Sequence, residues 1–177
     1  MGLADRDYHR AGGGMGAGGS PLGSPGGGGA GGPGFSAVTW LLIINAGVFL
    51  IAGVLAGSRR GGGVSPYGWG AFTIGDGVHG LQVWRALTYQ FLHAGLFPLL
   101  FNMIALYFFG PLMERWWGTR RFVAFYLVCG LGGAALYTVL AYVPGVLEVE
   151  AGTPMVGASA CIFGILVGCA MKYPDMR

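Results

Sequence analysis

Hydrophobic and charged positions divide most of the chain into long uncharged stretches that end in short charged ones. Residues 38–56 carry no charge and are followed closely by Arg59 and Arg60. An α-helix rises about 1.5 Å per residue, so roughly 20 apolar residues cross the hydrocarbon core of a bilayer. The pattern therefore predicts a first membrane-spanning helix over residues 38–56.

Three further stretches show the same pattern. No charge occurs from residue 86 to residue 113, and the second part of this run, residues 97–113, is predicted as the second span. Residues 122–143 are predicted as the third span, which Pro144 ends, and residues 156–171 as a shorter fourth span. The predicted fold is all-α, a polytopic bundle of membrane helices.

The first part of the chain has a different composition. Residues 1–35 consist of a short charged head followed by a run of Gly, Ala, Ser and Pro. Such a segment buries too little apolar surface to offset the entropy lost on ordering. We therefore expect a disordered, Gly-rich cytoplasmic tail over residues 1–35 and a membrane domain over residues 36–177.

Composition supports the lipid bilayer as the environment of this domain. Charged residues make up 10% of the chain and hydrophobic residues 54%, whereas soluble domains carry about 25% charged residues. The net charge of +3 forms no basic patch, so no nucleic acid partner is expected. Cys129, Cys161 and Cys169 lie in apolar runs and are interpreted as small buried hydrophobes, so neither a metal nor a cofactor is expected.

Positive charges predict the orientation in the membrane. Arg115, Arg120 and Arg121 lie between the second and third predicted spans, and Lys172 and Arg177 follow the fourth. Cytoplasmic loops are enriched in Lys and Arg, so this side and the N-terminus are predicted to be cytoplasmic. The two arginines after the first span are the exception. We expect an integral protein of the plasma membrane, because no organelle-targeting feature is present.

Ser159 and Asn102 are the candidate catalytic residues. Ser159 lies between small residues at the start of the fourth predicted span. A serine nucleophile needs a base and donors for the oxyanion that forms on attack. Asn102 is the best side-chain donor within the hydrophobic spans, although an asparagine in a membrane helix can also serve only to bond a neighbouring helix.

Four further residues are interpreted as structural. Trp84 and Arg85 precede the second span and are expected to anchor it at the lipid headgroups. His93 is interpreted as a hydrogen-bonding residue and not as a catalytic base. Glu114, at the cytoplasmic end of the second span, is expected to bond loop amides or to pair with Arg120 or Arg121.

Small residues predict a packing face on the fourth span. Gly157, Cys161, Gly164 and Gly168 follow one another in steps of four, three and four. Such a face lets neighbouring helix backbones approach closely. Ser159 is about 200° round the helix from Gly157 and is therefore predicted to point away from this contact.

Taken in order, the motifs of the chain resemble those of the rhomboid intramembrane serine proteases. The resemblance covers about residues 36–177. It rests on Trp84-Arg85, Leu92-His93-Ala94-Gly95, Leu99-Leu100-Phe101-Asn102-Met103, Gly110-Pro111-Leu112-Met113-Glu114 with Gly118, and Gly157-Ala158-Ser159 with Phe163-Gly164.

The resemblance implies a function and roles for single residues. It implies a six-helix core, of which four helices are predicted here, and cleavage of transmembrane protein substrates by a serine–histidine dyad without a cofactor. Ser159 corresponds to the nucleophile. Asn102, together with the backbone N–H of the serine, corresponds to the group that binds the oxyanion.

Three departures from the family pattern bear on activity. Ala160 stands where the family usually has glycine, and Pro98 stands where it commonly has a histidine that helps to bind the oxyanion. Proline has neither a side-chain donor nor an N–H, although it is tolerated at a helix start. The family's catalytic histidine comes from a sixth helix, so the chain is expected to be truncated after its fourth span and not to cleave substrates alone.

Two other functions remain open at this point. One is a non-catalytic rhomboid-like membrane protein that binds client helices. Pro98 and the missing histidine favour it, and the presence of Ser159 and Asn102 counts against it. The other is an unrelated four-span structural or transport protein, against which the ordered motif set counts.

Overall fold

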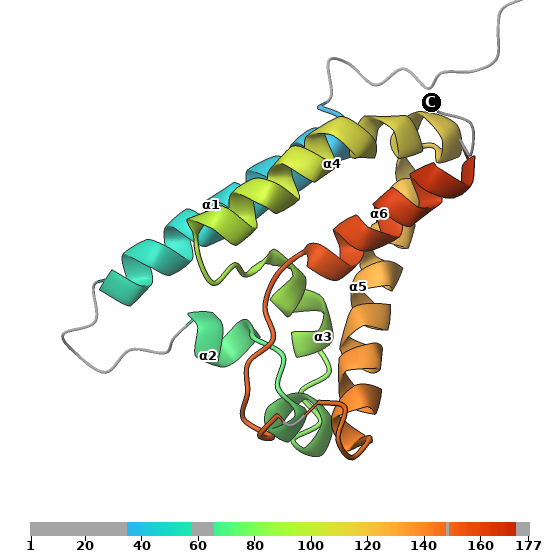
Figure 1. The fold of residues 1–177 in the computed structure, drawn as a ribbon. Coiled ribbons are helices and arrows are strands. Elements are labelled where there is room, and N and C mark those ends of the chain that lie inside the picture. The colour runs from blue at the N-terminus through green and yellow to red at the C-terminus, as the bar shows by residue number, and fades with distance from the viewer. Residues whose placement is uncertain (1–34, 58–65, 148, 173–177) are drawn as a thin grey trace, which may run out of the picture. The chain divides into compact units, whose positions relative to one another are not determined.

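The computed structural model describes residues 35–57, 66–147 and 149–172 of the chain. Over these residues all regular elements are helical, apart from one isolated β-bridge between Phe72 and Met155, which confirms the all-α fold class. In chain order they are α1 (Ala37–Gly57), α2 (Pro66–Gly70), the π-helical turn η1 (Ile74–His79), α3 (Arg85–Thr88), the 3₁₀ turn η2 (Tyr89–Phe91), α4 (Leu96–Trp117), α5 (Thr119–Tyr142) and α6 (Ser159–Lys172) (Figure 1). The predicted tail and the Arg59–Arg60 pair lie outside the described residues.

Three of the described helices, α1, α4 and α5, are long and apolar enough to cross a membrane. The fourth apolar helix, α6, has 14 described residues, or about 21 Å at 1.5 Å per residue. It begins at Ser159 and not at residue 156, as the sequence predicted. Gly157 explains the difference, because its φ of +124° lies outside the range of a right-handed helix.

The junction between α4 and α5 consists of one residue. The helix α4 continues through Glu114 and Arg115 to Trp117, and α5 begins at Thr119. Gly118 alone separates them, with a φ of +75° that glycine adopts readily, and its N–H bonds the carbonyl of Glu114. Glu114 and Arg115 are thus part of the helix, and they lie at the end of the span.

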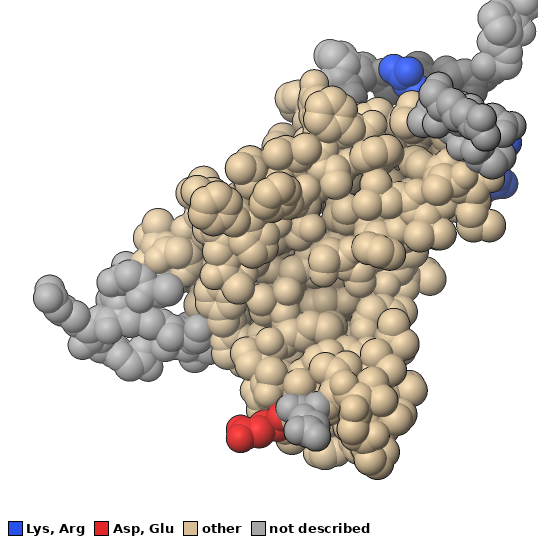
Figure 2. All heavy atoms as spheres, viewed as in Figure 1, with Lys and Arg blue, Asp and Glu red and all other residues tan. Residues whose placement is uncertain are grey.

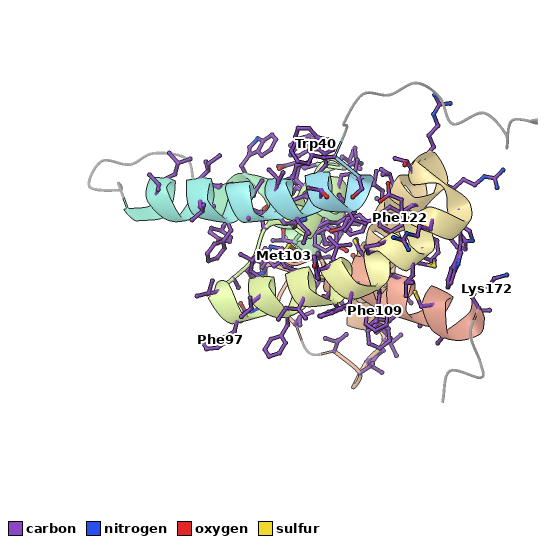
Figure 3. The ribbon with its side chains drawn as sticks, turned by 90° about the horizontal axis from the view of Figure 1, so that it is seen from above. Trp40, Phe97, Met103, Phe109, Phe122 and Lys172 are labelled. Carbon is purple, nitrogen blue, oxygen red and sulfur yellow. The ribbon has the colours of Figure 1, made fainter. Side chains whose placement is uncertain are left out.

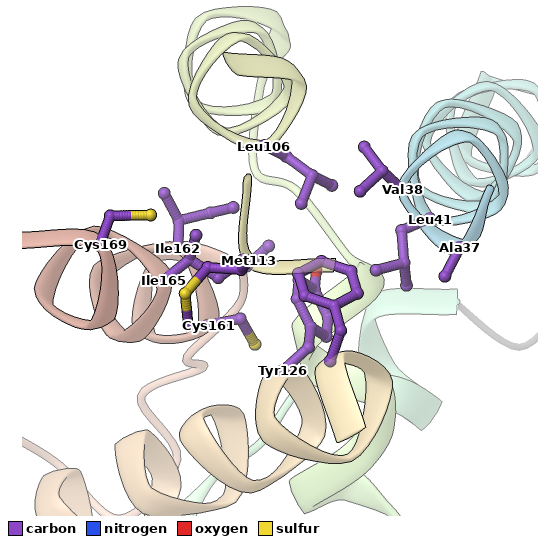
Figure 4. Packing of buried hydrophobic residues seen from close by; sticks show 12 residues of the cluster. Ala37, Val38, Leu41, Leu106, Met113, Tyr126, Cys161, Ile162, Ile165 and Cys169 are labelled. Carbon is purple, nitrogen blue, oxygen red and sulfur yellow. The ribbon is translucent and has the colours of Figure 1, made fainter. Parts of the chain in front are cut away.

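Side chains from α1, α4, α5 and α6 form one hydrophobic core. Leu106 and Met113 of α4 and Tyr126 of α5 are completely buried there, with Cys161 and Ile165 of α6 beside them (Figure 4). Seen from above, α1 and α4 run side by side, and Met103 lies between them while Phe97 points outward (Figure 3). The helix α4 thus packs against α1 on one side and α6 on the other.

Residues 66–95, which precede α4, form a series of short turns and helices. Arg85, 5% exposed, lies at the centre of this segment. The guanidinium donates to the carbonyls of Ala71 and Gly68 at 2.8 Å and to Oε1 of Gln82 at 2.7 Å. Anchoring at lipid headgroups would need an exposed arginine, so that interpretation is wrong for Arg85, which instead ties this segment together.

Exposed charged side chains of the described residues lie toward the two ends of the long helices. Arg115, Arg120, Arg121 and Lys172 lie where α4 meets α5 and where α6 ends, together with Glu114, whereas an acidic group is exposed at the opposite end (Figure 2). The surface between the two ends shows neither Lys, Arg, Asp nor Glu in this view. This uncharged surface and the three long apolar helices are those of an integral membrane protein.

Candidate active site around Ser159

Ser159 is exposed at the first position of α6. It follows a tight turn in which Gly157 and Ala158 are buried, and the first α-helical bond runs from the N–H of Ile162 to the carbonyl of Ala158. N–H groups in the first turn of a helix have no partner within the helix and favour negative charge. The backbone N–H of Ser159 is therefore suited to bind a developing oxyanion beside its own hydroxyl.

The Ser159 side chain lines an apolar groove of about 880 Å³ between α5 and α6. The groove extends along α6 to Lys172, and α4 contributes Met113 and Trp117 to its wall. Among the described residues that line it, Ser159 carries the one hydroxyl. The groove thus gives access to one hydroxyl in a mostly apolar lining.

Small residues bring the walls of this groove close together. They are Ala160, Gly164 and Gly168, spaced four apart along α6. A Cβ at position 168 would approach Cε of Met113 to 2.6 Å, and one at position 164 would overlap Cys129. Ser159 borders the same groove and is exposed, and its orientation away from the small-residue contact remains a prediction. The stripe begins at Ala160, since Gly157 precedes the helix.

The methyl group of Ala160 fits against a glycine of α5. A Cβ on Gly133 would overlap the Cβ of Ala160 and would lie 2.9 Å from Oη of Tyr89. The extra methyl group relative to the glycine usual in the family therefore occupies space that Gly133 leaves free. This fit keeps α5 and α6 in contact beside Ser159.

Asn102 lies on α4 and is bonded to His93. Its amide nitrogen is 3.1 Å from Nε2 of His93, and Nδ1 of His93 is 3.4 Å from the carbonyl of Phe91. A carbonyl only accepts, so Nδ1 carries the proton and Nε2 accepts from Asn102. This arrangement fixes which way the Asn102 amide is turned and leaves its second N–H available.

His93 is held in its neutral form. It is 1% exposed, and burial lowers the pKa of its imidazole below the ordinary value, while the bond to the Phe91 carbonyl partly opposes this shift. Because Nδ1 and Nε2 both have partners, His93 is not available as a base for Ser159. Pro98 lies exposed in the first turn of α4 and offers no donor.

No base for Ser159 lies among the described residues. Its hydroxyl makes no hydrogen bond there, and His79, the other described histidine, bonds Oη of Tyr142 at 2.8 Å. Nor do these residues contain a cluster of His, Cys, Asp or Glu that could hold a metal ion. The described residues thus contain an exposed serine hydroxyl and no group that takes a proton from it.

Glu114 caps the N-terminus of α1. Its carboxylate accepts from the backbone N–H groups of Ala37 at 2.9 Å and Val38 at 3.3 Å, and from the hydroxyl of Thr119 at 2.9 Å. The amides expected from the sequence are thus those of a helix start and not those of a loop. A carboxylate is favourable at this end of a helix dipole.

The long apolar helices are those of an integral membrane protein, and Ser159 is exposed at the start of one of its helices, α6. The family model of the rhomboid domain matches residues 80–177 of the chain. This match covers more than half of the chain, which therefore belongs to the rhomboid family.

Relatives agree with this assignment. The chain is 38% identical over 97 residues to RHOMBOID-like protein 1 of Arabidopsis thaliana, a match that covers 55% of this chain and 23% of the relative. It is 37% identical over 83 residues to Rhomboid protease GluP of Bacillus subtilis (strain 168), covering 47% and 14%. It is also 34% identical over 85 residues to Inactive RHOMBOID-like protein 8 of A. thaliana, covering 48% and 22%. The chain thus spans about a quarter or less of these relatives.

Two residues next to the site were not singled out from the sequence. Tyr89 and Gln90, both buried, contact the turn that carries Ser159. The available signal was a glutamine within an uncharged run, since a buried amide in such a place requires partners.

Proposed function

We propose that the chain carries the nucleophile of an intramembrane serine endopeptidase that cleaves transmembrane protein substrates. The observation that carries the proposal is the exposed hydroxyl of Ser159 at the start of α6, at the wall of an apolar groove. Membership in the rhomboid family and the relatives named as proteases support it.

In this mechanism the oxygen of Ser159 attacks the scissile carbonyl carbon while a base takes the hydroxyl proton. The negative charge that develops on the carbonyl oxygen is stabilised by the backbone N–H of Ser159 and by the free N–H of Asn102, whose amide His93 orients. Collapse of the tetrahedral intermediate then expels the amine, which takes the proton from the base.

The base must come from outside the described residues. Resemblance to the family implies a histidine on a further helix, and the groove is where such a helix would reach Ser159.

Cleavage of a model transmembrane substrate by the full-length protein in proteoliposomes tests the proposal. Ser159→Ala should abolish cleavage, because no other hydroxyl lines the described groove. Ser36→Ala is the matched control, since Ser36 is exposed and bonded to Thr39, away from the groove, and should leave the rate unchanged. Cleavage that survives Ser159→Ala would refute the assignment.

A second function is a non-catalytic protein that binds client helices. Pro98 supports it, because it removes one donor from the oxyanion site, and such a loss has cost about 100- to 1000-fold in rate elsewhere. One relative is named inactive. Substrate helices that bind to the full-length protein without being cleaved, with equal affinity in wild type and Ser159→Ala, would favour this function.

We further propose that the chain lies in the plasma membrane with its N-terminus facing the cytoplasm. The cations at Arg115, Arg120, Arg121 and Lys172 support this orientation through the positive-inside rule. In intact spheroplasts, a membrane-impermeant maleimide should label Glu150→Cys and not Thr119→Cys. The opposite labelling would reverse the orientation.

A further inference from the structure

Two adjacent residues of η2 hold the turn of Ser159 from both sides. The backbone N–H of Gly157 donates to the carbonyl of Tyr89 at 3.0 Å. The thiol of Cys161 donates to Oε1 of Gln90 at 3.3 Å. Gly157 and Cys161 lie two positions before and after Ser159, so the nucleophile is centred between two fixed points.

Tyr89 and Gln90 are themselves fixed by bonds to their surroundings. Tyr89 is 2% exposed, and its hydroxyl donates to the carbonyl of Gly130 on α5 at 2.5 Å. Gln90 is fully buried, and its Nε2 donates to the carbonyl of Ala86 at 2.9 Å. This bond turns Oε1, the accepting atom, toward Cys161.

Glycines of α5 make room for this pair. A Cβ on Gly130 would overlap the Gln90 amide, and one on Gly133 would lie 2.9 Å from Oη of Tyr89. The pair is therefore wedged between α5 and the start of α6. It has little freedom to move without moving one of those helices.

Further polar groups adjoin the pair on the side of the core. The hydroxyl of Tyr126 lies beside the Asn45 amide and the Cys161 thiol, although neither this hydroxyl nor Oδ1 of Asn45 completes a hydrogen bond of good geometry. Figure 4 shows Cys161 and Tyr126 facing each other. Oε1 of Gln90 therefore provides the well-defined polar anchor for the thiol.

We infer that Tyr89 and Gln90 are positioning residues for Ser159, an inference that rests on the proposed function. Neither residue touches the groove; Tyr89 acts through the backbone N–H of Gly157, and Gln90 acts through the thiol of Cys161. Gly157 adopts a φ of +124°, which L side chains rarely adopt, so the turn before Ser159 depends on a glycine at this position. Misplacement of a reacting group by about 1 Å can cost about 100-fold in rate, so small shifts of this turn matter.

Substitution of Gln90 tests the inference in the full-length protein. Gln90→Met keeps the length of the side chain and removes the acceptor. We expect kcat to fall about tenfold or more while KM changes less than about twofold, because the site is misaligned and the groove is intact. The rate at which a fluorophosphonate labels Ser159 should fall in parallel.

Cys161 provides a conservative rescue. Cys161→Ala should lower kcat as Gln90→Met does, whereas Cys161→Ser retains a donor to Oε1 and should stay within about threefold of wild type. The double variant Gln90→Met/Cys161→Ala should be no slower than either single variant, because both substitutions remove the same hydrogen bond. Cys169→Ala is the matched control, since its thiol lies on the same helix and bonds Phe109, away from Ser159.

A measurement without catalysis separates this inference from the proposed function. In detergent micelles, amide hydrogen exchange of a peptide covering residues 155–162 should be about tenfold faster in Gln90→Met than in wild type or Cys169→Ala. Unchanged exchange, or kcat equal to that of Cys169→Ala, would overturn the inference. If wild type neither cleaves nor is labelled while the exchange difference persists, the proposed function fails. The role of Tyr89 and Gln90 in holding residues 157–161 in place is then retained.

Discussion

At the residue scale, the fit between Ala160 and Gly133 accommodates a departure from the family pattern next to Ser159. The extra methyl group at position 160 is evident from the sequence, but the sequence does not tell which residue accommodates it. These two residues belong to different helices, and their contact depends on how α5 and α6 pack. Such a non-local pairing cannot be predicted from the local pattern of either helix.

Gly133→Ala should destabilise the protein by about 1–3 kcal/mol, because the new Cβ overlaps Ala160 and crowds the Tyr89 hydroxyl. Gly132→Ala is its matched control, since a Cβ there meets nothing within 4 Å. Unfolding free energies in mixed micelles measure both. Adding Ala160→Gly to Gly133→Ala should recover part of the loss, and equal stabilities of the two alanine variants would contradict the fit.

His93 should make stability depend on pH. Its pKa is lowered in the folded protein, so the unfolded chain binds the proton more readily. Stability is therefore constant above the unfolded pKa of about 6.5 and falls as the pH drops below it toward the folded pKa. In unfolding measurements between pH 8 and 5, His93→Gln should show a weaker loss below about pH 6.5, and an identical pH profile would argue against a buried neutral His93.

At the element scale, Glu114 of α4 fixes the start of α1. Glu114→Gln removes the charge that faces the N–H groups of Ala37 and Val38. A loss of about 0.3–1 kcal/mol is expected from the helix dipole, measured as unfolding free energy. Glu150→Gln changes an exposed carboxylate and should have no comparable effect, so equal losses in both variants would count against the capping role.

The helices that the sequence predicted well are those with long uncharged runs. Such runs mark α1, α4 and α5 directly, because membrane-length apolar segments have few alternatives to a helix. The segment from α2 to η2 was missed, since its short turns have no regular periodicity and depend on Arg85 bonding distant carbonyls. The start of α6 was placed too early because the apolar pattern continues through Gly157.

At the scale of the whole molecule, the site joins elements that are far apart in sequence. Motif order predicted that Ser159 and Asn102 belong to one site, and this remains a prediction, because the described residues show no hydrogen bond between them. The structure adds that Asn102 is oriented by His93 and that the Ser159 turn rests on η2. These relations arise from packing of α4, α5 and α6 around the segment before α4.

The most direct test of the account is to locate a fluorophosphonate adduct in the full-length protein by mass spectrometry. A single modified residue, Ser159, is expected, with labelling lost in Ser159→Ala and retained in Ser36→Ala. An adduct on another residue, or no adduct on a folded full-length protein that still cleaves its substrate, would contradict the assignment of Ser159 as the nucleophile.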